Sequence, residues 1–161
     1  MVTSSAPGKV YLFGEHAVVY GEPAVPCAIE LRAEVTVRKR DDHGLRVQAN
    51  DLSLDGFTVE YEGEATGRPD IDVSDSLVDA AMGYVNEAIT QVEDAADVEG
   101  VGFDIRIDSE IPLGAGLGSS AAVAVAAIDA GTRELGVELP AEEIAERAYR
   151  VEHAVQDGQA S

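Results

Sequence analysis

The sequence has 161 residues, with 31 acidic against 11 basic side chains and a formal net charge of -20. Hydrophobic residues make up 45% of the chain, which excludes an acidic disordered tail and is enough for one buried core. A charge of this sign repels nucleic acid and anionic lipid, so we expect neither as a partner. No apolar run of about 18 residues and no signal-peptide pattern occur, so we expect a cytoplasmic protein with no membrane span.

The acidic excess itself has two interpretations. We favour adaptation to high intracellular salt (a halophilic protein), because a Debye length of about 3 Å at 1 M would screen the self-repulsion. The alternative is an ordinary acidic protein with a solvated surface. The single Cys27 excludes an internal disulfide, and no Cys/His cluster has zinc-site spacing.

The first sixty residues predict strands, because short apolar or alternating runs rich in β-branched residues are separated by turn signals. The expected strands are residues 9–13, 24–29, 34–40, 45–49 and 57–61. The glycine- and proline-containing stretch 63–72 predicts a loop.

The second part of the chain predicts helices around one more strand. Apolar side chains recur at three- and four-residue spacing over 77–92, which indicates an amphipathic helix. Residues 101–107 alternate as in a half-buried strand, and 121–130 are apolar all round, which indicates a buried helix. A last helix is expected from Pro140 onward. This order predicts an α/β or α+β fold, in which helices cover a mixed sheet.

The stretch 111–120 is the most distinctive local pattern, since it places three glycines and two serines directly before the buried helix. Glycines let a backbone approach a ligand closely, and the free amides and dipole of a helix start favour an anion. The spacing is neither that of a Walker A loop nor that of a dinucleotide-binding fingerprint. A phosphate-binding loop is our interpretation, and a glycine-rich turn before a buried helix is the alternative.

A second pattern covers residues 6–21, where Lys9, Glu15 and His16 lie among apolar residues. Charged groups in such surroundings are costly unless they are paired. Lys9 could stabilise a developing alkoxide or a phosphoryl group, and His16 could donate to a substrate oxygen. The alternatives are a Lys9–Glu15 ion pair and a histidine that is satisfied within the core.

Together these two segments resemble the GHMP kinase family. Pro7-Gly8-Lys9, followed by Gly14-Glu15-His16-Ala17-Val18-Val19-Tyr20-Gly21, is similar to the opening of its mevalonate kinase branch, whereas galactokinases continue Gly-Glu-His with Thr-Asp. Pro112-Leu-Gly-Ala-Gly-Leu-Gly-Ser-Ser-Ala-Ala122 is similar to the family's phosphate-binding loop. The resemblance implies a two-layer sandwich like domain 2 of ribosomal protein S5, and ATP-dependent phosphorylation of mevalonate in isoprenoid biosynthesis.

The resemblance also implies roles for individual residues. Lys9 would be catalytic, Glu15 and His16 would bind substrate, and Ser120 with Glu152 would bind Mg²⁺. The ATP-binding residues would be Pro112, Leu113, Gly114, Ala115, Gly116, Leu117, Gly118, Ser119, Ser120, Ala121 and Ala122. The expected small-molecule partners are therefore mevalonate and ATP. A homodimer is an alternative to a monomer as the oligomeric state.

The family's third motif, which carries a catalytic aspartate, has no full counterpart in this chain. The resemblance places that aspartate about three residues beyond Ser161, and Asp157 is not a convincing substitute, because it precedes the glycine of the motif. We therefore expect residues 1–161 to be a truncated GHMP kinase N-terminal domain, without the C-terminal domain and inactive alone. Phosphomevalonate kinase and a non-catalytic nucleotide-binding domain are the alternative functions.

Overall fold

The computed structural model describes residues 1–17, 20–50, 57–61, 75–112 and 115–159. Its strands are β1 (Val2–Phe13), β2 (Val25–Lys39), β3 (Leu45–Asn50), β4 (Phe57–Tyr61) and β5 (Phe103–Ser109), and its helices are α1 (Asp75–Ala96), α2 (Ser119–Glu134) and α3 (Ala141–Gln159). The strands form one sheet in the order β1-β2-β5-β3-β4, in which only β3 and β5 run parallel.

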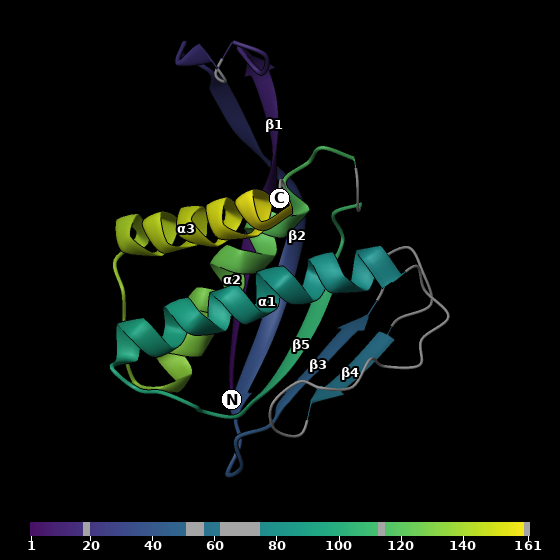
Figure 1. The fold of residues 1–161 in the computed structure, drawn as a ribbon. Helices are drawn as coiled ribbons and strands as arrows, with labels where there is room; N and C mark the ends of the chain where they lie inside the picture. Colours follow the sequence, from purple (N-terminus) through teal and green to yellow (C-terminus); the bar gives the residue numbers. More distant parts are fainter. Residues whose placement is uncertain (18–19, 51–56, 62–74, 113–114, 160–161) are drawn as a thin grey trace.

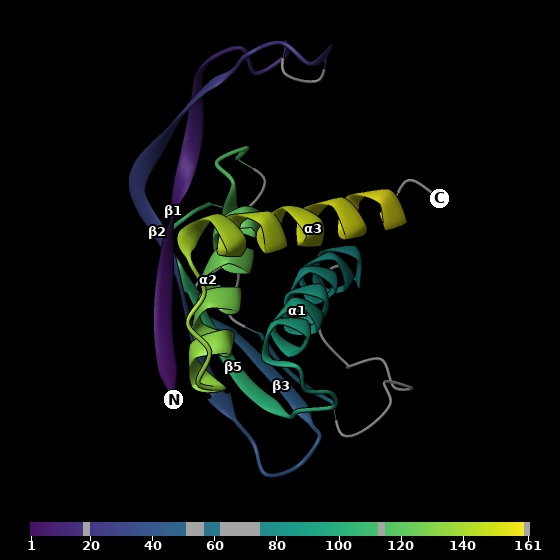
Figure 2. The same ribbon diagram turned by 90° about the vertical axis from the view of Figure 1, so that its left-hand side faces the viewer.

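The molecule has two layers, as the resemblance implies. All three helices lie on one face of the sheet, and they also pack against one another (Figures 1 and 2). Helix α2 lies over β1 and β2, with α1 and α3 beside it. No helix in the described ranges is long and apolar enough to cross a membrane.

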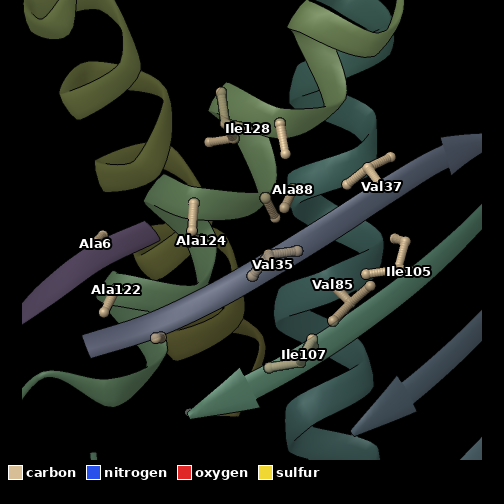
Figure 3. Close-up of a cluster of buried hydrophobic side chains, with 14 of the residues drawn as sticks. Ala6, Val35, Val37, Val85, Ala88, Ile105, Ile107, Ala122, Ala124 and Ile128 are labelled. Carbon is tan, nitrogen blue, oxygen red and sulfur yellow. The ribbon is translucent and has the colours of Figure 1, made fainter. Parts of the chain in front are cut away.

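The core lies between the sheet and the helices, where alternate strand residues point toward the helical layer (Figure 3). Val35 and Val37 of β2 and Ile105 of β5 are at most 2% exposed, and Val85 of α1 packs above them. The alternation predicted for 101–107 is confirmed from Phe103 to Ile107, because the inward residues of β5 are buried and Arg106 is exposed. It is wrong for Gly102, which was expected to face outward and is buried before the strand begins.

Helix α2 is buried because its residues are small. Eight of its residues are buried, and they are Ala122, Ala124, Ala126, Ala127, Ile128, Ala130, Gly131 and Thr132. A Cβ added at Gly131 would lie 2.7 Å from Cγ2 of Val92 in α1, so the two helix backbones approach closely there. This confirms the buried helix that the apolar run predicts.

The first strands differ from the prediction, because β1 begins at Val2 and β2 is one continuous strand where two were expected. A bulge separates the two halves of the pair: Pro7 pairs with Arg32 and Lys9 with Ala28, so residues 29–31 lie opposite Gly8. Beyond the bulge, β1 and β2 continue as a two-stranded ribbon that projects past the helices (Figures 1 and 2). We call the described residues of this segment, 9–17 and 20–28, the projecting ribbon.

The sheet face opposite the helices carries charged side chains. Arg38 and Arg40 both bond to Asp104 of β5, and Arg40 also bonds to Asp42. Partial burial opposes ionisation of Asp104, but the bonds from the two arginines hold its pKa below the ordinary value. The Arg40 guanidinium likewise lowers the pKa of Asp42. This face is therefore stabilised by ion pairs.

Candidate active site

The start of helix α2 presents backbone amides in an arrangement that could hold an anion. Gly118 closes the preceding loop with φ 73° and ψ 34°, a left-handed conformation that favours glycine. Among the residues that the structure describes, no side chain caps the helix, and its first turn contains no acid. The amides of residues 119–121 therefore point out of the helix end, where its dipole favours negative charge. Leu113 and Gly114 of the predicted loop lie outside the described residues.

Strand β1 meets this loop backbone to backbone. The Lys9 amide donates to the carbonyl oxygen of Leu117 at 2.8 Å. A Cβ at Gly8 would lie 2.9 Å from the same oxygen, and one at Gly118 would lie 2.9 Å from Cγ of Lys9. The absence of side chains at both glycines therefore lets the strand and the loop touch. This contact brings Lys9 to the start of α2.

The Lys9 side chain does not pair with Glu15 in the described part of the chain. Its Nζ instead lies 4.0 Å from the ring centroid of Tyr11. Sequence reasoning did not single out Tyr11, although the two-residue spacing on a strand places it on the same side as Lys9. The ion pair considered as an alternative role for Lys9 is thus wrong.

Glu15 and His16 occupy the turn at the tip of the projecting ribbon. The Ala17 amide donates to the Gly14 carbonyl at 3.1 Å, and both Glu15 and His16 are exposed. The alternative of a core histidine is therefore wrong. The structure does not gather these two side chains around the start of α2, where Lys9 lies.

Ser120 and Glu152 come together from different helices. The Ser120 hydroxyl, in the first turn of α2, donates to Oε1 of Glu152 in α3 at 3.1 Å, and both residues are half-buried. Hydroxyl and carboxylate oxygens are ligands that Mg²⁺ accepts, usually together with substrate phosphates and water. The pair therefore fits a magnesium site beside the amides of α2. The described residues contain no cluster of three or more His, Cys, Asp or Glu side chains that could hold a metal ion. A magnesium ion at Ser120 and Glu152 would therefore need phosphate oxygens or water as further ligands.

Two family models match the chain. Residues 83–161 match the N-terminal domain of the GHMP kinases, and residues 2–39 match the galactose-binding signature of galactokinase. The second match covers the projecting ribbon, where His16 is followed by Ala17. The two matches together include Lys9, Glu15, His16 and the whole loop before α2.

Curated relatives extend the similarity over almost the whole chain. Mevalonate kinase of Pyrococcus furiosus is 46% identical over 96% of this chain and 46% of the relative. Mevalonate kinase of Archaeoglobus fulgidus is 40% identical over 98% of this chain and 46% of the relative. The chain thus spans about half the length of the curated relatives it matches.

Solved structures show the same fold. The crystal structure of Methanococcus jannaschii mevalonate kinase matches with a TM-score of 0.77 and 32% identity, over 96% of this chain and 47% of that one. Lactococcus lactis galactokinase matches with a TM-score of 0.71 and 21% identity, over 96% of this chain and 38% of that one, which shows the fold alone. By its family match, its relatives and its fold, this chain belongs to the GHMP kinase family.

Proposed function

We propose that residues 1–161 form the N-terminal domain of an ATP-dependent mevalonate kinase, which makes mevalonate 5-phosphate. One observation carries the proposal: the bond from the Lys9 amide to Leu117 brings a lysine to the amide-lined start of α2. Phosphoryl transfer depends mainly on positioning and charge neutralisation, and this arrangement offers both. The curated relatives named mevalonate kinase support mevalonate as the acceptor.

Each group of site residues would have its own role in the reaction. The amides at the start of α2 would bind the ATP phosphates, and the Lys9 ammonium would neutralise charge on the transferred phosphoryl group. Ser120 and Glu152 would hold Mg²⁺, which neutralises phosphate charge when bound. Glu15 and His16 would bind mevalonate from the projecting ribbon. An oxygen–phosphorus bond to the mevalonate hydroxyl forms as the bond to ADP breaks.

The proton of that hydroxyl needs an acceptor. We propose that the acceptor is an aspartate in the part of the longer relatives that lies outside their match to this chain. The same proposal includes a cytoplasmic location and a homodimer as the oligomeric state.

A coupled ATP-to-ADP assay tests the function on the 161-residue chain and on a version extended past Ser161, which we call the extended protein. We expect mevalonate-dependent turnover of the extended protein in molar KCl, and its loss when EDTA removes magnesium. Galactose and phosphomevalonate serve as competing acceptors. Turnover with either one and none with mevalonate would reject the proposed substrate.

The change Lys9→Met tests the role of the ammonium in the extended protein. We expect turnover to fall at least about 100-fold, because removing one donor that stabilises transition-state charge typically lowers kcat by about 10²–10³. ATP binding, measured by calorimetry, should change little, since the loop amides remain. Turnover equal to that of the unsubstituted protein would exclude Lys9 from catalysis.

A further inference from the structure

Tyr11 lies where it can control the direction of the Lys9 side chain. The Lys9 Nζ is 4.0 Å from the centroid of the Tyr11 ring, well inside the range of about 6 Å over which a ring face attracts a cation. Both residues are half-buried, which limits competition from water for the ammonium.

Two further contacts fix the near end of the same side chain. The Lys9 amide is bonded to the Leu117 carbonyl, and the lysine stem runs across Gly118, where an added Cβ would be 2.9 Å from Cγ and 3.2 Å from Cε. The stem thus starts at the loop before α2, and the ammonium ends over a ring two residues farther along the projecting ribbon.

The chemical nature of the ring suits this place. A carboxylate beside Lys9 would neutralise the ammonium and compete with phosphate oxygens for its N–H donors. An aromatic face attracts the charge through its quadrupole and accepts no conventional hydrogen bond, so the three donors of the ammonium stay available. In the described part of the chain no acid is paired with Lys9, which leaves the Tyr11 ring as the group that orients its ammonium.

We propose that Tyr11 is a positioning residue, whose ring face holds the Lys9 ammonium between the start of α2 and the Glu15–His16 turn. The inference rests on the proposed kinase function. Its effect belongs to the chemical step, because the contact directs the lysine and leaves the loop amides unchanged.

Kinetics of the extended protein test the proposal with Tyr11→Leu and Tyr11→Phe. We expect Tyr11→Leu to lower kcat about 3- to 30-fold, the range that a cation–π contact supports, with little change in the KM for ATP. Tyr11→Phe keeps the ring and should stay within about twofold of the unsubstituted protein. Phe13→Leu is the matched control, since Phe13 lies in the same strand and is 74% exposed.

Three kinetic results would overturn the proposal. These are an unchanged kcat in Tyr11→Leu, an equal loss in Tyr11→Phe, and an equal loss in Phe13→Leu. Thermal unfolding of each variant separates a loss of folded protein from a loss of rate.

NMR of the 161-residue chain tests the contact independently of catalysis. The chain has only two lysines, Lys9 and Lys39, so ¹³C-labelled lysine gives two signals, which Lys39→Arg assigns. We expect an upfield ring-current shift of the Lys9 Hε protons that persists in Tyr11→Phe and disappears in Tyr11→Leu. Equal shifts in all three proteins would overturn the proposal. If the contact is present and the extended protein does not phosphorylate mevalonate, the proposed function has failed, whereas the contact itself stands.

Discussion

Gly118 occupies a position in which a side chain would push against Lys9. Its φ of +73° costs an alanine about 1 kcal/mol of backbone strain, and the added Cβ would lie 2.9 Å from Cγ of the lysine. Gly116 has nearly the same φ, +71°, but open space around an added Cβ. The pair separates backbone strain from the contact with Lys9.

We therefore expect Gly118→Ala to lower the free energy of unfolding about 1 kcal/mol more than Gly116→Ala does, since crowding adds to strain. Urea unfolding of both variants measures the difference. An equal decrease in the free energy of unfolding in both variants would mean that the Lys9 side chain moves aside without loss of stability. Gly118 would then be needed only for its positive φ in the loop before α2.

Asp104 makes part of the stability depend on pH. Its pKa is lowered in the folded protein, so its contribution is present above the unfolded value of about 3.9 and is lost as the pH falls through the folded value. At pH 7 we expect Asp104→Asn to reduce the free energy of unfolding by about 1 kcal/mol, through weakened bonds to Arg38 and Arg40.

Unfolding in urea at several pH values checks this. The difference between Asp104→Asn and the unsubstituted protein should shrink as the pH falls below about 4, because Asp104 is then protonated first in the unfolded chain and, at lower pH, in the folded protein. A difference that is constant down to pH 2 would assign the effect of Asp104 to packing.

Among the elements, helix α3 is bonded to α1 through one buried arginine, Arg147. Arg147 donates to the Gln91 carbonyl at 3.1 Å, to Asp94 at 2.8 Å and to Glu143 at 2.9 Å. The bond to Asp94 raises the pKa of Arg147 against the effect of burial. These bonds from Arg147 hold α3, the helix that contains Glu152, against α1.

Replacing this arginine should loosen α3. We expect Arg147→Met to lower the free energy of unfolding by about 1–3 kcal/mol, since it leaves the Gln91 carbonyl without that donor. Arg150→Met is the control, because its exposed pair with Glu146 is worth only about 0.3–0.5 kcal/mol. Equal effects of the two changes on chemical denaturation would contradict this role of Arg147.

The elements also show how far the sequence predicts this fold. Every helix and the alternation of β5 follow from local patterns, because apolar spacing alone decides which face is buried. The continuity of β2 does not, since Glu30 and Arg32 interrupt the apolar pattern. Only the pairing with β1 on both sides of the bulge joins the two expected strands into one.

The same limit applies to the site. The glycine loop and Lys9 are visible in the sequence as residue types that suit phosphate. The resemblance pairs Ser120 with Glu152 as metal ligands, and the structure brings them together at 3.1 Å. The bond from Lys9 to Leu117 joins distant segments through backbone atoms, which carry no residue-specific pattern, so only the structure reveals it.

At the scale of the whole molecule, the charge of -20 predicts a strong response to salt. Raising KCl from 0.1 to 1 M shortens the Debye length from about 10 to about 3 Å and screens repulsion between acids. We expect Tm to rise by several degrees, because each kcal/mol of added stability raises Tm by about 2–4 °C in a chain of this length. An equal osmolality of sucrose is the control, and a Tm that falls in KCl would reject the interpretation as a salt-adapted protein.

The strand order has a consequence for how the chain acquires its shape during synthesis. β1 with β2 and β3 with β4 are hairpin neighbours along the chain, but β5 lies between the two pairs in the sheet. Each hairpin therefore has an unpaired strand edge until residues 103–109 leave the ribosome. Unpaired strand edges can pair with the wrong segment or with another chain. We expect folding to be slow for the size of the chain, because its decisive step joins segments far apart in sequence. The start of α2, the phosphate-binding site in our proposal, thus forms only after β5 has joined the two hairpins.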